Sequence, residues 1–308
     1  QRLAWSPNSS TLAFVSAHEG DVDLYALGAD GATWRLTTTP ALEVRPRWSP
    51  DGKALAVTSA SSFGTGAGWA DPALQVVLAQ GGQPLWSVVS PTLANGEGAS
   101  VVTGVTWLGA DAVAAVWQSP IGGGSDTHVY QLGDGQDVTL ATSSVPQTLS
   151  WSSTTQTLVI LGHQGLSTWR PGESEATQII SEPVGQALWS PQGDVLLYTV
   201  DDGGSQPGTY LWSLGTDGDL KRVSPVSASQ LAWSPDGQQA LVDGAILSHG
   251  GEELGRLPDT FVQALEWSEQ RLIFAVRPEP AAQLWDIWVW DGQAARKVDS
   301  GAREQTGE

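Results

Sequence analysis

Short apolar segments alternate with polar turns along the entire chain. Runs such as Thr11–Ser16, Val195–Val200 and Arg271–Val276 are rich in apolar and β-branched side chains and are followed by residues that favour turns. Runs of this length and composition predict β-strands. No segment combines a sustained 3.6-residue periodicity with the capping residues of a helix. The hydrophobic pattern therefore predicts an all-β protein.

One phrase recurs at the end of predicted strands. It is clearest as Trp233-Ser234-Pro235-Asp236-Gly237, which lies between the apolar runs 231–232 and 240–242. Pro fixes φ and Asp-Gly accepts positive φ, so the phrase predicts strand, tight turn and strand. The tryptophans that open its intact and eroded copies, here called the anchor tryptophans, are Trp5, Trp48, Trp107, Trp151, Trp189, Trp233 and Trp267. Seven copies in 308 residues average 44 residues each, as expected for four-stranded propeller blades of about 40–45 residues.

Each repeat is predicted to contain four strands, with Asp-Gly turns such as Asp30-Gly31 and Asp134-Gly135 between its outer strands. Sheets of this kind, arranged radially, bury both faces against their neighbours. The prediction is a seven-bladed β-propeller of four-stranded antiparallel blades, with six or eight blades as alternatives. A single domain would cover residues 1–308, with blades at about 1–40, 41–98, 99–144, 145–182, 183–226, 227–259 and 260–302.

The anchor tryptophans are expected to fill the widening space between adjacent blades. The chain has 16 Trp against four Phe and four Tyr, so Trp supplies most of the aromatic burial. The first predicted strand already takes an innermost position, and the seventh repeat has four strands of its own. We therefore expect closure without strand exchange, through packing of the first blade on the seventh.

Composition narrows the range of partners. Fourteen basic and 33 acidic residues give a formal charge of −19, which repels nucleic acid and anionic lipid. The lack of cysteine excludes disulfides, thiol catalysis and cysteine-ligated metals. No apolar run approaches the roughly 18 residues of a membrane-spanning helix. Because the chain begins with Gln1 and not with Met, we expect a mature form or an excised domain.

The repeat resembles that of TolB-like, WD-repeat-like bacterial β-propellers. The resemblance rests on RWSPDGKALAVTS from Arg47, LAWSPDGQQALV from Leu231 and LAWSPNSSTLAFVS from Leu3, and extends loosely over nearly all of the chain. Such blades occur in TolB, in actinobacterial envelope lipoproteins and in the gating domain of prolyl-oligopeptidase-type peptidases. The resemblance implies a periplasmic, cell-surface or secreted setting. TolB itself has six such blades and a separate α/β domain, and this chain departs from it in both respects.

Motifs for catalysis or metal binding are weak in this sequence. Gly124-Ser125-Asp126 and Gly204-Ser205-Gln206 lack the second Gly of a nucleophile elbow. Gly64–Gly68 lacks the Lys and the helix of a phosphate-binding loop, so we expect a flexible surface loop there. The four histidines lie in separate repeats, and Asp201–Gly204 lacks the ligand spacing of a calcium loop. We therefore predict no catalytic residue, no metal site and no cofactor.

Polar side chains around the first strand of each repeat form one candidate site. Those expected at the propeller channel or its mouth are Arg2, Glu43, Arg45, Arg47, Gln186, Gln230 and Glu266. Two interpretations stay open. The set could line a water-filled channel with ion pairs that join the blades, or it could form a pocket for an anionic group or a peptide terminus. The arginines favour the second interpretation, because guanidinium groups bind carboxylates through paired hydrogen bonds.

Phe63 and Trp69 form a second candidate, in the Gly-rich interruption Ser61–Pro72 of the second repeat. Aromatic residues in an irregular loop often mark a contact surface, although Trp69 could instead fold back over the propeller. Another interruption, Pro91–Ser100, follows the fourth predicted strand of the same repeat. If hairpins alternate between the two faces, both loops lie on one face, which we expect to be the contact surface.

These observations favour a non-catalytic protein-interaction or scaffold propeller of the bacterial cell envelope or exterior, and not an enzyme. Its partner would be another protein or another domain of the same polypeptide. Two alternatives stay open. The chain could be the propeller domain of a larger prolyl-oligopeptidase-type hydrolase that carries its catalytic domain elsewhere, or it could bind a small ligand or a glycan.

Overall fold

The computed structural model consists of β-strands joined by turns. It describes residues 3–17, 22–64, 68–82, 84–90, 100–119, 124–140, 146–162, 164–201, 203–214, 219–258, 261–268, 271–277 and 285–298. Among these residues there is no helix, and hence none long and apolar enough to cross a membrane. The predicted all-β class is confirmed.

The described residues form seven four-stranded sheets. The first four contain β1 (Leu3–Trp5), β2 (Thr11–Ser16), β3 (Asp23–Gly28) and β4 (Thr33–Arg35); β5 (Leu42–Trp48), β6 (Ala54–Ala60), β9 (Ala73–Leu78) and β10 (Pro84–Val89); β11 (Val101–Trp107), β12 (Ala112–Gln118), β13 (Ser125–Gln131) and β14 (Asp137–Leu140); and β15 (Pro146–Ser152), β16 (Thr157–Gly162), β17 (Gly165–Trp169) and β18 (Thr177–Ile180). The last three contain β19 (Val184–Trp189), β20 (Val195–Val200), β21 (Gly208–Ser213) and β22 (Asp219–Ser224); β23 (Leu231–Trp233), β24 (Gln239–Val242), β25 (Ala245–Ser248) and β26 (Glu253–Arg256); and β27 (Phe261–Ser268), β28 (Arg271–Val276), β29 (Asp286–Trp290) and β30 (Ala295–Lys297).

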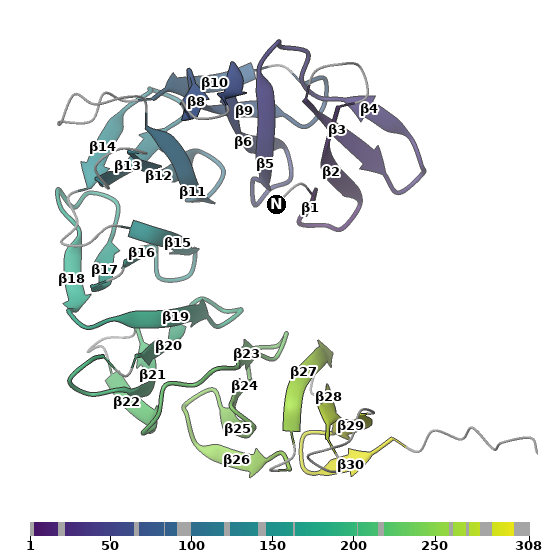
Figure 1. The fold of residues 1–308 in the computed structure, drawn as a ribbon, viewed down its shortest axis with the longest axis vertical. Helices are drawn as coiled ribbons and strands as arrows, with labels where there is room; N and C mark the ends of the chain where they lie inside the picture. Colours follow the sequence, from purple (N-terminus) through teal and green to yellow (C-terminus); the bar gives the residue numbers. More distant parts are fainter. Residues whose placement is uncertain are drawn as a thin grey trace, which may run out of the picture. The chain divides into compact units, whose positions relative to one another are not determined.

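Strands that follow one another in a repeat pair antiparallel in the same sheet (Figure 1). Every first strand carries its anchor tryptophan at or next to its last residue, as the sequence predicts. The second sheet differs from the others because a small hairpin of β7 (Ser62–Gly64) and β8 (Gly68–Ala70) is inserted between β6 and β9. Gly64 and Gly68 thus pair as strand residues, where a flexible loop was expected. The seventh sheet contains only strands of its own repeat.

The chain divides into two compact units, residues 1–181 and residues 182–308. The first unit contains the first four sheets and the second contains the last three. The boundary between the units lies between the strands β18 and β19. All described strands fall inside the predicted repeat limits, because the strand and turn signals that set those limits are local in the sequence.

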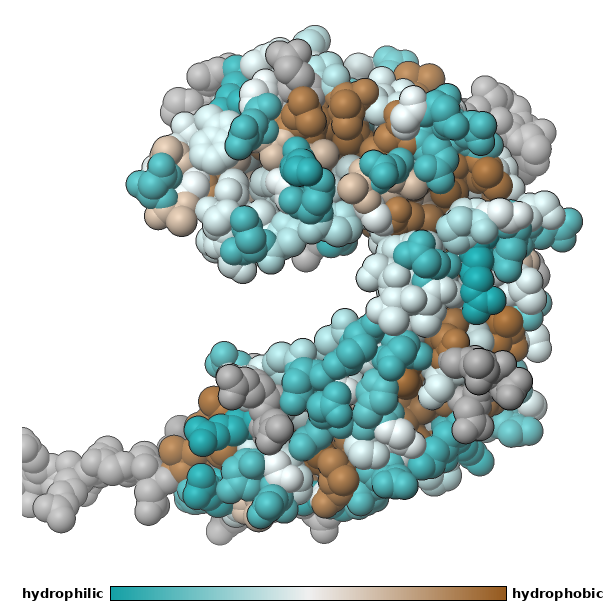
Figure 2. Space-filling model, turned by 180° about the vertical axis from the view of Figure 1, so that it is seen from behind, coloured by the Kyte–Doolittle hydropathy of each residue, from teal (hydrophilic) through white to brown (hydrophobic). Residues whose placement is uncertain are grey.

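The middle strands of the sheets carry the core of each unit. In the first unit Leu24 of the first sheet packs with Leu55 and Val57 of the second. In the second unit Ile246 of the sixth sheet packs with Phe274 of the seventh. β6, β16 and β20 are buried at every position, as expected where sheets cover both faces of a strand. Each large apolar side chain buried in this way contributes about 1.5–3 kcal/mol. Figure 2 shows hydrophilic residues over much of one face, with apolar patches between them.

The repeated turn is held by its serine. In the intact copies Ser6, Ser49, Ser190 and Ser234 are buried. Each serine hydroxyl accepts a hydrogen bond from the backbone N–H five residues later, and donates one to a side-chain oxygen of Asn8, Asp51, Asp194 or Asp236. Where Gln192 replaces the aspartate of the phrase, Asp194 is the acceptor. The serine therefore ties the first strand of a sheet to the start of the second.

Three of the anchor tryptophans join neighbouring sheets through hydrogen bonds as well as through packing. The indole N–H of Trp48 donates to the carbonyl of Ala4 at 2.9 Å, and that of Trp107 donates to the carbonyl of Arg47 at 2.9 Å. In the second unit Trp233 makes the same contact with Leu188 at 3.3 Å. In each case the acceptor precedes the anchor tryptophan of the preceding sheet. These hydrogen bonds fix the position of one first strand relative to the first strand of the preceding sheet.

Burial of the anchors is less uniform than we predicted. Trp107 is 6% exposed, whereas Trp5 is 61% exposed. The remaining anchors are partly buried. The first sheet has no preceding sheet in its own unit, so Trp5 lacks the carbonyl that its counterparts Trp48 and Trp107 use. Because no sheet of the first unit precedes the sheet of Trp5, the burial of Trp5 against a preceding sheet stays a prediction.

Candidate functional site

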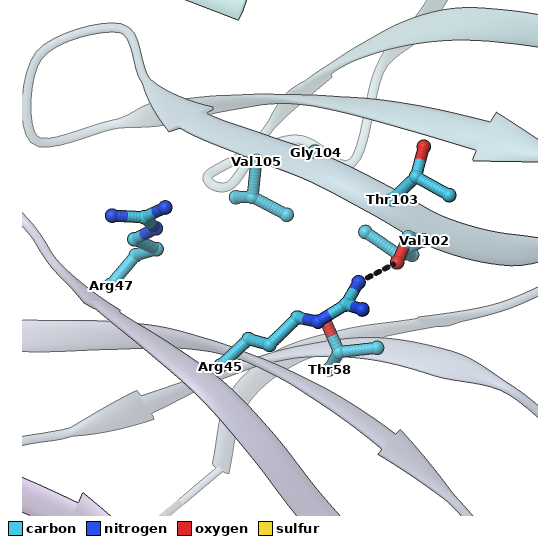
Figure 3. Close-up of a pocket in the computed structure, with 7 residues that line it drawn as sticks. All are labelled: Arg45, Arg47, Thr58, Val102, Thr103, Gly104 and Val105. Carbon is cyan, nitrogen blue, oxygen red and sulfur yellow. Dashed lines mark hydrogen bonds between the residues drawn. The ribbon is translucent and has the colours of Figure 1, made fainter. Parts of the chain in front are cut away.

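A cavity of about 300 Å³ lies beside the first strands of the second and third sheets, within the first unit. Figure 3 shows Arg45 and Arg47 reaching from β5 towards β11. The residues that line the cavity are Arg45, Arg47, Thr58, Val102, Thr103, Gly104 and Val105. They come from β5, β6 and β11. We refer to this cavity as the arginine pocket.

Backbone irregularities in both first strands shape the arginine pocket. In β5 Val44 pairs with Thr58 and Arg47 with Ala56, so two residues of β5 lie opposite one residue of β6. β11 has a similar shift between Val102 and Gly104. Such β-bulges bend a strand and redirect its side chains. Arg45 lies inside the first bulge with φ 58°, a conformation that costs a non-glycine residue about 1–3 kcal/mol and tends to persist at functional sites.

The two arginines differ in how they are held. The Nη1 atom of Arg45 donates to the carbonyl oxygen of Val102 at 3.0 Å, which carries the guanidinium across to β11. Arg47 is exposed, and its backbone carbonyl accepts the indole N–H of Trp107. Within the described part of the chain, the guanidinium of Arg47 has no hydrogen bond and no ion pair. Arg47 therefore presents its N–H groups to the pocket.

The carboxyl group closest in sequence to the arginines lies in the protein interior. Glu43 of β5 is 0% exposed, and its Oε1 atom accepts the hydroxyl of Thr39 at 2.6 Å. Its Oε2 atom has no hydrogen-bond partner among the described residues. Burial raises the pKa of the Glu43 carboxyl to about 7; hydrogen bonds from Thr39 and Thr37 oppose the rise, and the charge of Asp23 adds to it. Glu43 is thus separated from the pocket lining, in contrast to the predicted common channel set.

The lining of the pocket suits an anion. It provides two guanidinium groups and the side chains of Thr58 and Thr103, and none of the seven lining residues is acidic. Guanidinium groups offer N–H donors in a fixed planar arrangement that matches a carboxylate. Val105, which is partly exposed, adds apolar surface beside these donors, whereas Val102 is buried. The pocket can therefore hold a small anionic group next to a hydrophobic one.

The other predicted channel residues are not gathered at this pocket. Gln186 lies in the second unit, where its side-chain amide donates to the carbonyl of Ser229 at 3.3 Å, and the backbone N–H of Gln230 donates to Asp243. Glu266 is exposed on β27. Arg2 lies outside the described residues. Thr58 and Thr103 were missed, because only the bulged register brings them beside Arg45.

The predicted contact loop is described only through its backbone. Phe63 and Trp69 lie opposite each other in the β7–β8 hairpin, but their side chains lie outside the described part of the structure. The first interruption does join the second and third strands of its sheet, as predicted. Of the second interruption only residue 100 is described beyond β10 and Ser90. A contact surface on this face stays a prediction.

Histidine and acidic side chains elsewhere take part in local structure. The Nδ1 atom of His128 lies 3.1 Å from both carboxylate oxygens of Asp137. His249 contacts the carbonyl of Gly237 and the carboxylate of Asp194, and so links the fifth and sixth sheets. His18 and His163 lie outside the described residues. Among the described residues no group of three His, Asp or Glu side chains is arranged to hold a metal ion.

Comparison with known proteins places the fold among β-propellers. No family model matches the sequence. An uncharacterized peptidase, YuxL, of Bacillus subtilis is 46% identical over 56 residues, which are 18% of this chain and 8% of that protein. A structure from an analysis of two prolyl endopeptidases superposes with a TM-score of 0.56 at 16% identity, covering 94% of this chain and 48% of that chain. The β-propeller domain of the Trilobed protease from Pyrococcus furiosus gives a TM-score of 0.52 at 13% identity, covering 96% of this chain and 83% of that domain.

These similarities correct one prediction. We expected a chain that is not an enzyme, with the propeller domain of a larger hydrolase as an alternative, but the sequence relative is named as a peptidase and both structures belong to proteases. The chain spans less than a tenth of that relative and about half of the endopeptidase chain. The similarities support a propeller without selecting the TolB-like repeat family. This chain has a β-propeller fold that it shares with the propeller domains of peptidases.

Proposed function

We propose that this chain is the propeller part of a peptidase and that it presents the arginine pocket to peptide substrates. The observation that carries the proposal is the 46% identity with a named peptidase over 56 residues. Identity at that level over more than one repeat exceeds what a shared propeller fold requires, since the structures that share the fold are only 13–16% identical. In this proposal the hydrolytic residues lie on another domain of the same polypeptide, which is the partner of the propeller.

The geometry of the first strands supports a role in substrate binding. Their side chains are more exposed than those of the middle strands: most positions of β5 and β19 are exposed or partly exposed, whereas β6 and β20 are buried throughout. The first strands therefore have side chains free to contact a ligand, and β5 and β11 use theirs to form the arginine pocket. A propeller in this position would select which peptides reach the hydrolytic residues. An extracytoplasmic setting and a TolB-like ancestry are part of this proposal.

The test uses the natural polypeptide that contains this chain. We expect it to react with a fluorophosphonate probe for serine hydrolases and to cleave short N-blocked chromogenic peptides, with both activities lost after treatment with a serine-directed inhibitor. A folded polypeptide, checked by circular dichroism, that neither reacts with the probe nor cleaves any peptide of a broad panel would overturn the proposal. The inhibitor-treated protein is the matched control for non-enzymatic hydrolysis.

A further inference from the structure

We infer that the arginine pocket binds the free α-carboxylate of a peptide C-terminus. This inference rests on the proposed function for its biological meaning, but the binding it describes can be measured without any catalytic step. Its starting point is the guanidinium of Arg47, which has no hydrogen bond or ion pair among the described residues and lines, together with Arg45, a cavity of about 300 Å³. That volume admits the end of a peptide but no folded domain.

Charge and shape favour a carboxylate over a polyanion. The chain carries a formal charge of −19, so it repels a nucleic acid or an anionic membrane. A single carboxylate brings one negative charge, which matches the positive charge of the Arg47 guanidinium, while the guanidinium of Arg45 is held on the carbonyl of Val102. Both cations are arginines and not lysines, and arginine matches the two oxygens of a carboxylate with two parallel N–H donors.

The remaining lining residues favour a C-terminal residue over an inorganic anion. Of the remaining lining residues, Val105 is partly exposed and Thr103 is exposed, whereas Thr58 and Val102 are almost fully buried. The α-carboxylate of a peptide is attached directly to a carbon that bears a side chain and an amide N–H. Such a ligand uses the donors and the apolar side chain of Val105 together, whereas an inorganic anion would leave Val105 without a partner.

The strained backbone of Arg45 supports a functional origin for the pocket. Its φ of 58° and the bulge around it are retained although they cost free energy. The hydrogen bond from Arg45 to Val102 holds one guanidinium in place before any ligand arrives. Preorganised donors lose less side-chain entropy on binding. Arg45 is thus a positioning element, while Arg47 supplies free N–H groups.

Ligand-observed NMR and calorimetry with short peptides test the inference. The probes are an N-acetylated tripeptide ending in valine, as the free acid and as the C-terminal amide, and a C-terminal amide that carries a glutamate side chain. We expect the free acid to bind and both amides to bind about tenfold more weakly or not at all, because a charge-assisted hydrogen bond is lost. Equal binding of the acid and its amide overturns the inference. Equal binding of the glutamate amide and the free acid also overturns it, since the pocket would then accept any carboxylate.

Substitutions locate the site. Arg47→Gln should weaken binding of the free acid about 10- to 100-fold, and Arg47→Lys should restore only part of it because lysine lacks the planar pair of donors. Arg47 is exposed, so both variants should keep the wild-type melting temperature. Arg256→Gln is the matched control, since it removes an exposed arginine of β26 in the other unit. Wild-type affinity in Arg47→Gln overturns the inference.

The outcome is separable from that of the proposed function. A polypeptide that cleaves peptides but binds the free acid and the amide equally leaves the peptidase assignment standing and removes the carboxylate site. A chain that binds the free acid through Arg47 within a polypeptide that cleaves no peptide supports the site and overturns the peptidase assignment.

Discussion

At the scale of single residues, the protein depends on a few buried polar groups whose hydrogen bonds are easily counted. The hydroxyl groups of the serines in the repeated turn both donate and accept a hydrogen bond. That of Ser234 accepts from the N–H of Gln239 and donates to Asp236. Glu43 is the opposite case, because one of its two buried carboxylate oxygens has no partner in the part of the chain that the structure describes. Both cases lead to measurable consequences, since an unsatisfied buried polar group costs about 1–3 kcal/mol.

We expect Ser234→Ala to destabilise the protein by about 1–3 kcal/mol, because it leaves the N–H of Gln239 without its acceptor in a buried turn. Urea unfolding monitored by tryptophan fluorescence measures the loss. Ser153→Ala, at an exposed turn position, is the control and should change the stability by less than about 0.5 kcal/mol. Equal midpoints for the two variants would show that the serine hydroxyl is dispensable.

Glu43 should make stability depend on pH. Its folded-state pKa of about 7 lies above the ordinary value of 4.5. The contribution of Glu43 to the free energy of unfolding is therefore complete below about pH 4.5. It is lost as the pH rises through about 7, because the folded state must then keep an ionised carboxylate in the interior. A shift of this size corresponds to about 2–4 kcal/mol.

Glu43→Gln isolates this effect, because the amide keeps the shape of the side chain but does not ionise. We expect the variant to gain about 2–4 kcal/mol relative to the wild type between pH 4.5 and pH 8. Denaturant unfolding at several pH values measures the difference, in which the contributions of all other titrating groups cancel. A constant difference across this range contradicts the prediction.

At the scale of elements, the first strands combine two tasks. Each carries an anchor tryptophan near its end, which binds the preceding sheet in three described cases. Several also carry a bulge, as β5, β11, β15 and β19 do. The bulge lies before the anchor in each strand, so the end of the strand can serve packing while its beginning can bend towards a ligand.

We expect the anchors to contribute to stability in proportion to their burial. Trp107→Ala should cost about 3–5 kcal/mol, because Trp107 is 6% exposed and its indole binds the carbonyl of Arg47. Trp233→Ala should cost less, since Trp233 is only partly buried and its hydrogen bond is longer. Denaturant midpoints with a common m-value give the comparison. A larger loss for Trp233→Ala would show that burial does not set the contribution of the anchors.

At the scale of the whole molecule, the large negative net charge affects the stability of the folded state. A formal charge of −19 spreads over a chain with only 14 basic residues, and most of the described ion pairs are exposed. Exposed pairs contribute little, typically about 0–1 kcal/mol each. Repulsion between the acidic groups therefore opposes the folded state more than ion pairs support it.

Moderate salt should consequently stabilise the protein. Raising NaCl from 10 mM to 150 mM shortens the Debye length from about 30 Å to about 8 Å, which weakens repulsion among dispersed charges more than it weakens contacts at 3 Å. We expect the urea midpoint at pH 8 to rise over this range. Sucrose at matched osmolality serves as the control for general solute effects. A midpoint that falls with NaCl would mean that attractive pairs dominate.

Local sequence determined the strands, the turns and the number of repeats. The Trp-Ser-Pro-Asp-Gly phrase sets a turn through the fixed φ of Pro and the positive φ of Gly237, which is 64° in the structure. Alternation of apolar runs with such turns needs no knowledge of distant contacts. The seven four-stranded sheets were therefore predictable.

Tertiary structure decided what these residues do. A bulge depends on how two strands pair, so the sequence did not indicate that Glu43 turns inward while Arg45 and Arg47 line a cavity. Thr58 and Thr103 join that cavity only through pairing across strands. Trp107 is buried, whereas Trp48 and Trp233, which open intact copies of the phrase, are only partly buried, because burial depends on the neighbouring sheet. Local pattern encodes elements, and the environment of a side chain is set by residues far away in the chain.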